Sequence, residues 1–195
     1  MKSRVAVPLL CLMIWMGVLA CSDGVMPTDA AGASFSASGR GAFGFNGSAK
    51  GFPTGEVRLT GGGSYDPATA SNVIPTDTTV VVASGGFDCT EAVDQGPLTG
   101  CQKDEGVRWD TAQLLASTMF KCTATDTPKP ATTSAHTAVL LADFYRAGNG
   151  IHESFTAPMI VSDSDLAPLI PGIQTLWIMG VGCGVANAHF NGRIE

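Results

Sequence analysis

The chain has 195 residues and carries 17 acidic residues against 11 Lys and Arg, a formal net charge of −6 at pH 7. The basic residues are scattered, which argues against nucleic acid and anionic lipid headgroups as main partners, because both require concentrated Lys and Arg. Only 14% of the residues are charged, while 24 are Gly and 11 are Pro, a composition more typical of a turn-rich β protein than of a helical one.

The first 21 residues have the organisation of a signal peptide. Lys2 and Arg4 precede a charge-free apolar run from Val5 to Cys21, which is somewhat short for a bilayer-spanning helix. The run ends in Val18-Leu19-Ala20-Cys21, the order apolar, apolar, small, Cys. These four residues resemble the lipobox of bacterial lipoproteins, in which the thiol is acylated and the preceding peptide is removed. An ordinary secretory peptide cut after Ala20 is the alternative.

The resemblance implies where the protein is located in the cell. It makes residues 1–20 a signal peptide, Cys21 the lipidation site carrying a fatty acid such as palmitate, and residues 21–33 a lipidated, flexible tether. The membrane is then a partner through the N-terminal lipid, and the protein is exported and anchored to the cell envelope. In lipoproteins the residue after the acylated cysteine influences sorting, and Ser22 favours the outer membrane in an organism that has one.

Residues 34–195 are expected to form one all-β domain. Removal of residues 1–20 leaves 175 residues, enough for a sizeable core, and a net charge near −8 because Lys2 and Arg4 are lost. Short runs of alternating apolar and small residues are separated by Gly, Pro, Asn and Asp. About 8–10 mostly antiparallel strands are predicted, in a β-sandwich or a closed β-barrel.

The expected strands follow from alternation and turn signals. Asn46-Gly47 is predicted to end the first strand, and Gly148-Asn149-Gly150 to connect the clearest hairpin. Residues 113–124 suit a short helix as well as a strand, and a strand from 117 is favoured. Residues 125–134, with two prolines, are predicted to be an exposed loop. The expected strands span residues 34–45, 56–65, 78–87, 107–109, 117–124, 137–146, 154–161, 174–179 and 185–190.

Four cysteines remain in the domain once Cys11 is removed with the signal peptide and Cys21 is set aside as the lipid site. In an oxidising compartment they are expected to form two disulfides, and three pairings are open. The favoured pairing joins neighbours in sequence and ties the middle of the chain to its last strand: Cys89 with Cys101, and Cys122 with Cys183. A zinc site is the weaker alternative, because no Cys-x-x-Cys knuckle is present.

Candidate chemistry outside the cysteines is sparse. His136, His152 and His189 show no metal-ligand spacing, and the adjacent pair His152-Glu153 would point to opposite faces of a strand. Asp163-Ser164-Asp165 places two carboxylates two residues apart without the remaining ligands of a calcium loop. The predictions therefore name no catalytic residue, no metal and no cofactor. Asp104 and Glu105, near Arg108 and Trp109, form a grouping that could bind a polar ligand but is more typical of a protein surface.

Six aromatic residues are candidates for lining a cavity that holds a small apolar molecule, although filling the core is their commoner role. They are Trp109, Phe144, Tyr145, Phe155, Trp177 and Phe190. The sequence thus favours a cell-envelope lipoprotein acting as a non-catalytic binding or structural surface component. A β-barrel carrier of a lipid or similar apolar ligand is the alternative, and an envelope enzyme the third hypothesis.

Overall fold

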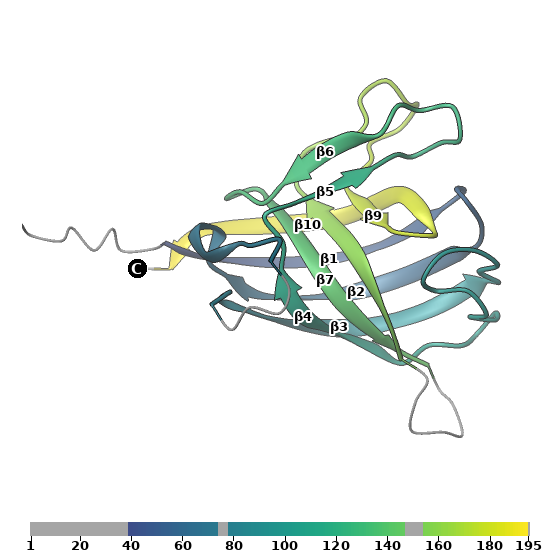
Figure 1. Ribbon diagram of the computed structural model, residues 1–195, viewed down its shortest axis with the longest axis horizontal. Helices are drawn as coiled ribbons and strands as arrows, with labels where there is room; N and C mark the ends of the chain where they lie inside the picture. The colour runs from purple at the N-terminus through teal and green to yellow at the C-terminus, as the bar shows by residue number, and fades with distance from the viewer. Residues whose placement is uncertain (1–38, 74–77, 147–153, 195) are drawn as a thin grey trace, which may run out of the picture. The chain divides into compact units, whose positions relative to one another are not determined.

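The computed structural model is an all-β protein with ten strands among the residues it describes, 39–73, 78–146 and 154–194 (Figure 1). Its only helical element in that part is a 3-10 turn at Pro67–Thr69. Within these ranges, no helix is long and apolar enough to cross a membrane. The strands are β1 (Arg40–Lys50), β2 (Glu56–Tyr65), β3 (Val81–Glu91), β4 (Arg108–Leu114), β5 (Ser117–Phe120), β6 (Lys129–Thr132), β7 (Thr137–Tyr145), β8 (Ser154–Ser162), β9 (Leu176–Ile178) and β10 (Gly182–Ile194).

Eight of these strands close into a barrel, so the barrel rather than the sandwich is the observed architecture. The order around the barrel is β1-β10-β9-β8-β7-β4-β3-β2, and every neighbouring pair is antiparallel. Barrel neighbours are consecutive in sequence except at β4–β7, where β5 and β6 leave the wall, and at β10–β1, where the barrel closes. Closure gives all eight strands two neighbours and removes the free edges that an open sheet would expose.

Alternation along each strand separates the barrel interior from its outer face. In β8 the odd-numbered residues from Phe155 to Val161 face inward, as their shared spacing predicts, and join the main core. In β10 Ala186 faces inward, while Val185 is 57% exposed on the outside. The inner residues of all eight strands therefore supply one continuous apolar core.

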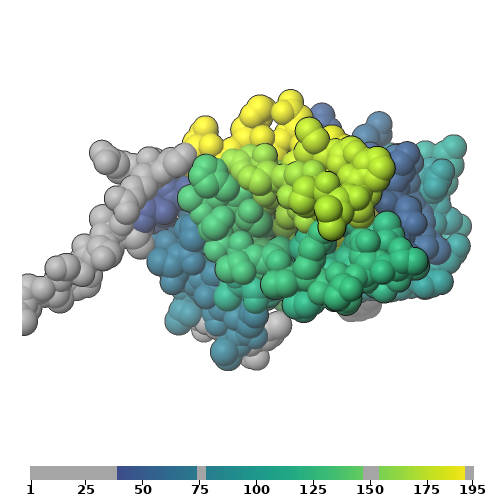
Figure 2. All heavy atoms as spheres, turned by 90° about the horizontal axis from the view of Figure 1, so that it is seen from above, coloured from purple at the N-terminus to yellow at the C-terminus, as the bar shows by residue number. Residues whose placement is uncertain are grey.

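The hairpin of β5 and β6 covers part of the outer wall as a second layer. Beneath it lies a smaller apolar cluster that includes Phe120, Val139, Ile160 and Trp177. The same cluster includes Ala167 from the segment between β8 and β9. The space-filling view shows the hairpin in green beside that segment in yellow-green (Figure 2). This outer layer makes one side of the barrel two layers thick.

Both disulfides have the favoured pairing. Cys89–Cys101 joins the end of β3 to the loop before β4, and Cys122–Cys183 joins the segment after β5 to the start of β10. The first bond lies beside a narrow seam, because the β3–β4 ladder contains two residue pairs. The second ties the outer layer to the barrel. Each crosslink thus reinforces a place with few backbone hydrogen bonds.

The strand predictions were right in number and type but wrong at several boundaries. β1 continues through Asn46-Gly47 to Lys50, because Gly47 lies against the backbone of Val185 and Ala186 in the neighbouring strand, where a Cβ would collide. The expected loop at 125–134 contains β6, in which Pro130 is tolerated at a sheet edge. The expected turn at Gly148-Asn149-Gly150 lies outside the described residues.

Candidate binding sites

The barrel interior is packed around Trp109, which is fully buried. Its indole Nε1 donates a hydrogen bond to the Thr60 carbonyl oxygen at 3.0 Å. The ring lies against two glycines of the neighbouring strands: a Cβ on Gly61 would come within 2.5 Å of the ring, and a Cβ on Gly85 within 2.7 Å. Glycine at these positions makes the space that the indole occupies. Trp109 therefore fills the interior instead of lining an empty one.

Two groups of aromatic rings occupy the remainder of the interior. Phe43 is stacked on Phe190, with ring centroids 5.7 Å apart, and meets Tyr65 edge-on at 5.7 Å. Towards the other end, Phe144 meets Phe87 edge-on at 5.2 Å and lies 6.5 Å from Phe155. These separations are in the range of direct aromatic packing. The rings pack against one another between adjacent strands and, at Phe87 and Phe144, from β3 to β7, as in a protein core.

One end of the barrel is closed by the loop between β3 and β4. Val93 and Leu98 of this loop are fully buried in the main core. Arg146 donates from Nη1 to the Gly100 carbonyl oxygen at 2.7 Å, and its guanidinium lies 5.5 Å from the centre of the Phe155 ring. The crosslinked loop thus acts as a lid held by apolar packing and by Arg146.

The opposite end is closed by Tyr65 and by the connection that follows β2. The Tyr65 hydroxyl donates to the Ser134 carbonyl oxygen at 2.7 Å. The Gln113 side-chain amide donates to the carbonyl oxygens of Ser71 and Val73 at 2.8 and 3.0 Å. Burial, together with the negative charge of Asp163, raises the pKa of Tyr65 to about 12, so this hydroxyl remains a donor well above neutral pH.

The six aromatic residues predicted to line one cavity do not surround a common space. Trp109 and Phe144 are fully buried in the interior, and Phe155 and Phe190 pack against the same core while partly exposed. Tyr145 and Trp177 lie on the outside of the wall, because each is the sequence neighbour of an inward-facing residue. Tyr145 stacks against the Arg108 guanidinium at 4.7 Å, and Trp177 belongs to the cluster beneath the outer layer.

His136 and Asp163 form a pair that no spacing along the chain reveals. The histidine Nδ1 lies 2.7 Å from the Asp163 carboxylate at the start of β7 and the end of β8. Ser164 donates to the other oxygen of the same carboxylate at 2.9 Å. The serine therefore contacts the acid and not the histidine, unlike a nucleophile–base–acid relay, in which the base lies between the other two. The His136 side chain is 69% exposed, and the pair joins two loops at the surface.

Asp165 organises the segment after β8. Its Oδ1 accepts hydrogen bonds from the backbone amides of Ala167 and Gln174, at 2.9 and 3.0 Å. These two bonds lower the pKa of the carboxyl group below its usual value. The Asp163-Ser164-Asp165 sequence thus builds a turn, and its two carboxylates bind different partners.

A polar groove, here called the hairpin groove, lies between β6 and this turn. Its volume is about 240 Å³. All four residues of β6 line one side of the groove. Ser162 and Ser164 are among the residues that line the other side. Lys129, at the start of β6, holds its ammonium 5.2 Å from the centre of the Phe120 ring. The full lining is Phe120, Lys129, Pro130, Ala131, Thr132, Thr137, Ser162, Ser164, Asp165 and Leu166.

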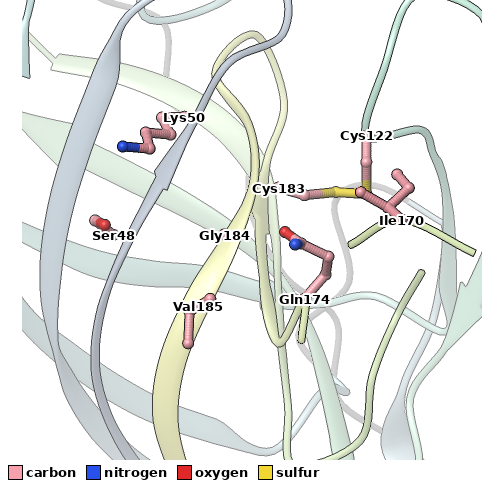
Figure 3. Close-up of a pocket in the computed structure, with 8 residues that line it drawn as sticks. All are labelled: Ser48, Lys50, Cys122, Ile170, Gln174, Cys183, Gly184 and Val185. Carbon is pink, nitrogen blue, oxygen red and sulfur yellow. A yellow bond between two sulfur atoms is a disulfide. The ribbon is translucent and has the colours of Figure 1, made fainter. Parts of the chain in front are cut away.

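A second groove, of about 270 Å³, runs beside the long-range disulfide (Figure 3). Its lining includes the Cys122–Cys183 bond, Ile170 and the exposed Val185. Lys50 is at its margin, but its ammonium lies 3.9 Å from the Glu56 carboxylate on the neighbouring strand. Figure 3 shows the lysine extending away from the disulfide. The groove is mainly apolar and shallow.

The charged residues around the start of β4, which are close in sequence, have different partners in the structure. Glu105 accepts from the Gln102 amide at 2.8 Å and lies 3.5 Å from Arg146, whereas Arg108 pairs with Asp110 at 3.6 Å. Trp109 points into the core between them. This grouping does not form one polar site.

The remaining candidate site residues either lie away from the two grooves or are outside the described residues. His189 is on the outer face of β10, while His152, Glu153 and the lipidation candidate Cys21 are outside the described ranges. Within those ranges, no group of three or more His, Cys, Asp or Glu side chains is arranged to hold a metal ion.

Comparison with known proteins adds no relative: no family model, no curated protein and no solved structure matches this chain. The hairpin groove has no signal in the sequence, because β6 shows no alternation of apolar residues and contains a proline. The His136–Asp163 pair has none either, because the two residues are 27 positions apart and meet only when β7 and β8 pair.

Proposed function

We propose that this chain is a lipoprotein precursor of the cell envelope, lipidated at Cys21, whose barrel acts as a non-catalytic binding or structural component. The observation that favours this role over that of a carrier is the packed interior. Trp109 and Phe144 are fully buried, their neighbours pack ring against ring, and both ends of the barrel are covered. A partner would then bind on the outer surface, where the hairpin groove and the groove beside the Cys122–Cys183 disulfide lie.

The placement at the envelope rests on residue types and on the disulfides. The lipobox-like Val18-Leu19-Ala20-Cys21 supplies the anchor, and two disulfides suit an oxidising compartment better than a cytosol. The first described residues, Gly39 and Arg40, enter β1 at the barrel end that also holds Tyr65. A membrane tether joined there leaves the Leu98 lid at the far end.

The carrier hypothesis is less well supported by the same interior. A carrier of an apolar ligand requires a cavity, and ligand pockets are usually 300–1,000 Å³ in volume. Trp109 and Phe144, which would line it, are instead fully buried and packed against other rings of the core. The His136–Asp163 pair is the feature that would support an enzyme. The neighbouring Ser164, however, is hydrogen-bonded to the aspartate and not to the histidine, so the three side chains do not form a nucleophile–base–acid relay.

Fractionation of cells that express matched variants tests the anchor. The precursor is expressed with Cys21→Ser or, as the control, with Cys11→Ser. We expect the wild type and the control in the detergent-soluble membrane fraction and the Cys21 variant to lose its lipid and be released or retained as an unprocessed precursor. Equal lipid content in the Cys21 variant and the wild type would contradict the proposal.

A further inference from the structure

β6 is the edge of a two-stranded sheet, and the hairpin groove runs along its free side. β5 is its partner on one side, in a sheet of order β5-β6. On the other side all four residues, Lys129–Thr132, line the groove, and Ser162, Ser164 and Asp165 form the facing wall. The unpaired N–H and C=O groups of an edge strand that borders a groove can form hydrogen bonds with a ligand in that groove.

The register shows which backbone groups are presented. The Thr133 amide donates to the Ala116 carbonyl oxygen at 3.0 Å, which continues the β5–β6 ladder by one pair. In an antiparallel ladder the bonded and non-bonded positions alternate. Lys129 and Ala131 therefore bond towards β5, and the backbone groups of Pro130 and Thr132 point to the groove. Because proline has no N–H, the free edge presents one donor, the Thr132 amide, and two acceptors, the carbonyl oxygens of Pro130 and Thr132.

The charged groups around the groove already have partners within the chain. The Lys129 ammonium lies over the Phe120 ring, and the Asp165 carboxylate accepts from two backbone amides. The hydroxyl groups opposite also have partners, because Ser162 bonds to Thr137 and to the His136 carbonyl oxygen and Ser164 donates to Asp163. What remains for a ligand is the backbone edge of β6. These features match the repeating amide and carbonyl of an extended chain better than they match an ion or an apolar molecule.

We propose that the free edge of β6 binds an extended peptide segment of a partner protein by strand addition. The segment pairs with Pro130 and Thr132 through up to three backbone hydrogen bonds and runs about 13 Å along the groove, the length of four strand residues. Serine and threonine walls admit small and polar side chains. This deepens the proposed binding role and names its partner class, and it is independent of the lipid anchor.

Pro130 also sets the selectivity of this edge. A missing N–H removes one bond from any added strand, and prolines at edges oppose uncontrolled sheet extension. The edge therefore favours a short segment held also by the facing wall over indefinite pairing with further copies of the chain.

The test uses the mature protein in detergent micelles and a phage-displayed library of random linear dodecapeptides. Enriched peptides are synthesised and their affinities measured for the wild type and two variants. Thr132→Pro removes the one groove-side donor, whereas Thr132→Val keeps that donor and changes only the side chain. We expect at least a tenfold loss of affinity for Thr132→Pro and less than a threefold change for Thr132→Val.

Amide exchange in the wild type gives a second measurement that does not depend on a variant. The Thr132 amide is expected to exchange rapidly in the free protein and at least tenfold more slowly in the complex. The proposal is overturned if no enriched peptide slows this amide, or if Thr132→Pro binds as well as Thr132→Val. The location of Thr132→Pro in the cell is measured by the same fractionation as that of Cys21→Ser. Because Thr132→Pro leaves the lipidation site unchanged, its retention in the membrane tests the lipoprotein assignment, whereas its peptide affinity tests the strand-addition proposal.

Discussion

Truncation of Trp109 tests the packed interior on which the functional argument depends. Trp109→Ala removes a fully buried indole that lies against β2 and β3, together with its hydrogen bond to the Thr60 carbonyl oxygen. Large-to-small changes of this kind in a core cost about 3–5 kcal/mol, because the transfer free energy is lost and the surroundings collapse only partly. We therefore expect a loss of about 4 kcal/mol in the free energy of unfolding.

The assay is urea unfolding followed by far-ultraviolet circular dichroism, with both disulfides intact. For a domain of this size the loss corresponds to a fall in the melting temperature of about 8–16 °C. Tyr145→Ala is the matched control, since this aromatic lies on the outer face over Arg108 and is expected to contribute about 0.5–1 kcal/mol. If Trp109→Ala cost less than about 1 kcal/mol, the interior would behave as a hollow cavity and the reasoning would fail.

Three further predictions concern the wall, the crosslinks and the closed end. Gly85→Ala should cost about 1–3 kcal/mol or prevent folding, since its Cβ would collide with a backbone oxygen of β2; Gly86→Ala, with its nearest neighbour at 3.5 Å, should stay within about 1 kcal/mol, and equal urea midpoints would contradict this. Serine at both Cys122 and Cys183 should cost about 4 kcal/mol on the loop-entropy model, against about 3 for the shorter disulfide, and the reverse order of melting temperatures would refute it. The pKa of Tyr65 is raised in the folded state, so the fold binds its proton more tightly than the unfolded chain does, and stability should fall as the pH rises from 10 to about 12; Tyr65→Phe should show a shallower fall in urea titrations over that range.

The alternation of apolar residues predicted the barrel wall well where one face of a strand is buried. Phe43 and Phe45 point inward from β1, and the four odd-numbered residues of β8 do the same. β2 has the predicted bounds, Glu56–Tyr65. Period-two patterning is a local property, so a single sequence carries it.

Closure of the barrel and the position of the outer layer are not local properties. Closure depends on the pairing between β10 and β1, which are far apart in sequence. The outer layer covers the outer faces of β8 and β9, so both faces of these strands are buried and their apolar residues alternate less clearly with polar ones. Trp177 shows the consequence: it lies outside the barrel yet is buried beneath the hairpin, so burial alone could not assign it to the interior.

The cysteines were more informative than the polar residues. An even number of thiols with one short and one long spacing favoured the observed pairs, because few pairings exist. His136 and Asp163, by contrast, have many alternative partners along the chain, and only the β7–β8 register brings them to 2.7 Å.

Native mass spectrometry of the mature protein purified from its host tests the central claim most directly. The account predicts a chain that begins at acylated Cys21, has four fewer hydrogens than the reduced form because of its two disulfides, and carries no small apolar molecule inside the barrel. A mature N-terminus without acyl mass, or a stoichiometric apolar ligand that is released only on unfolding, would contradict it.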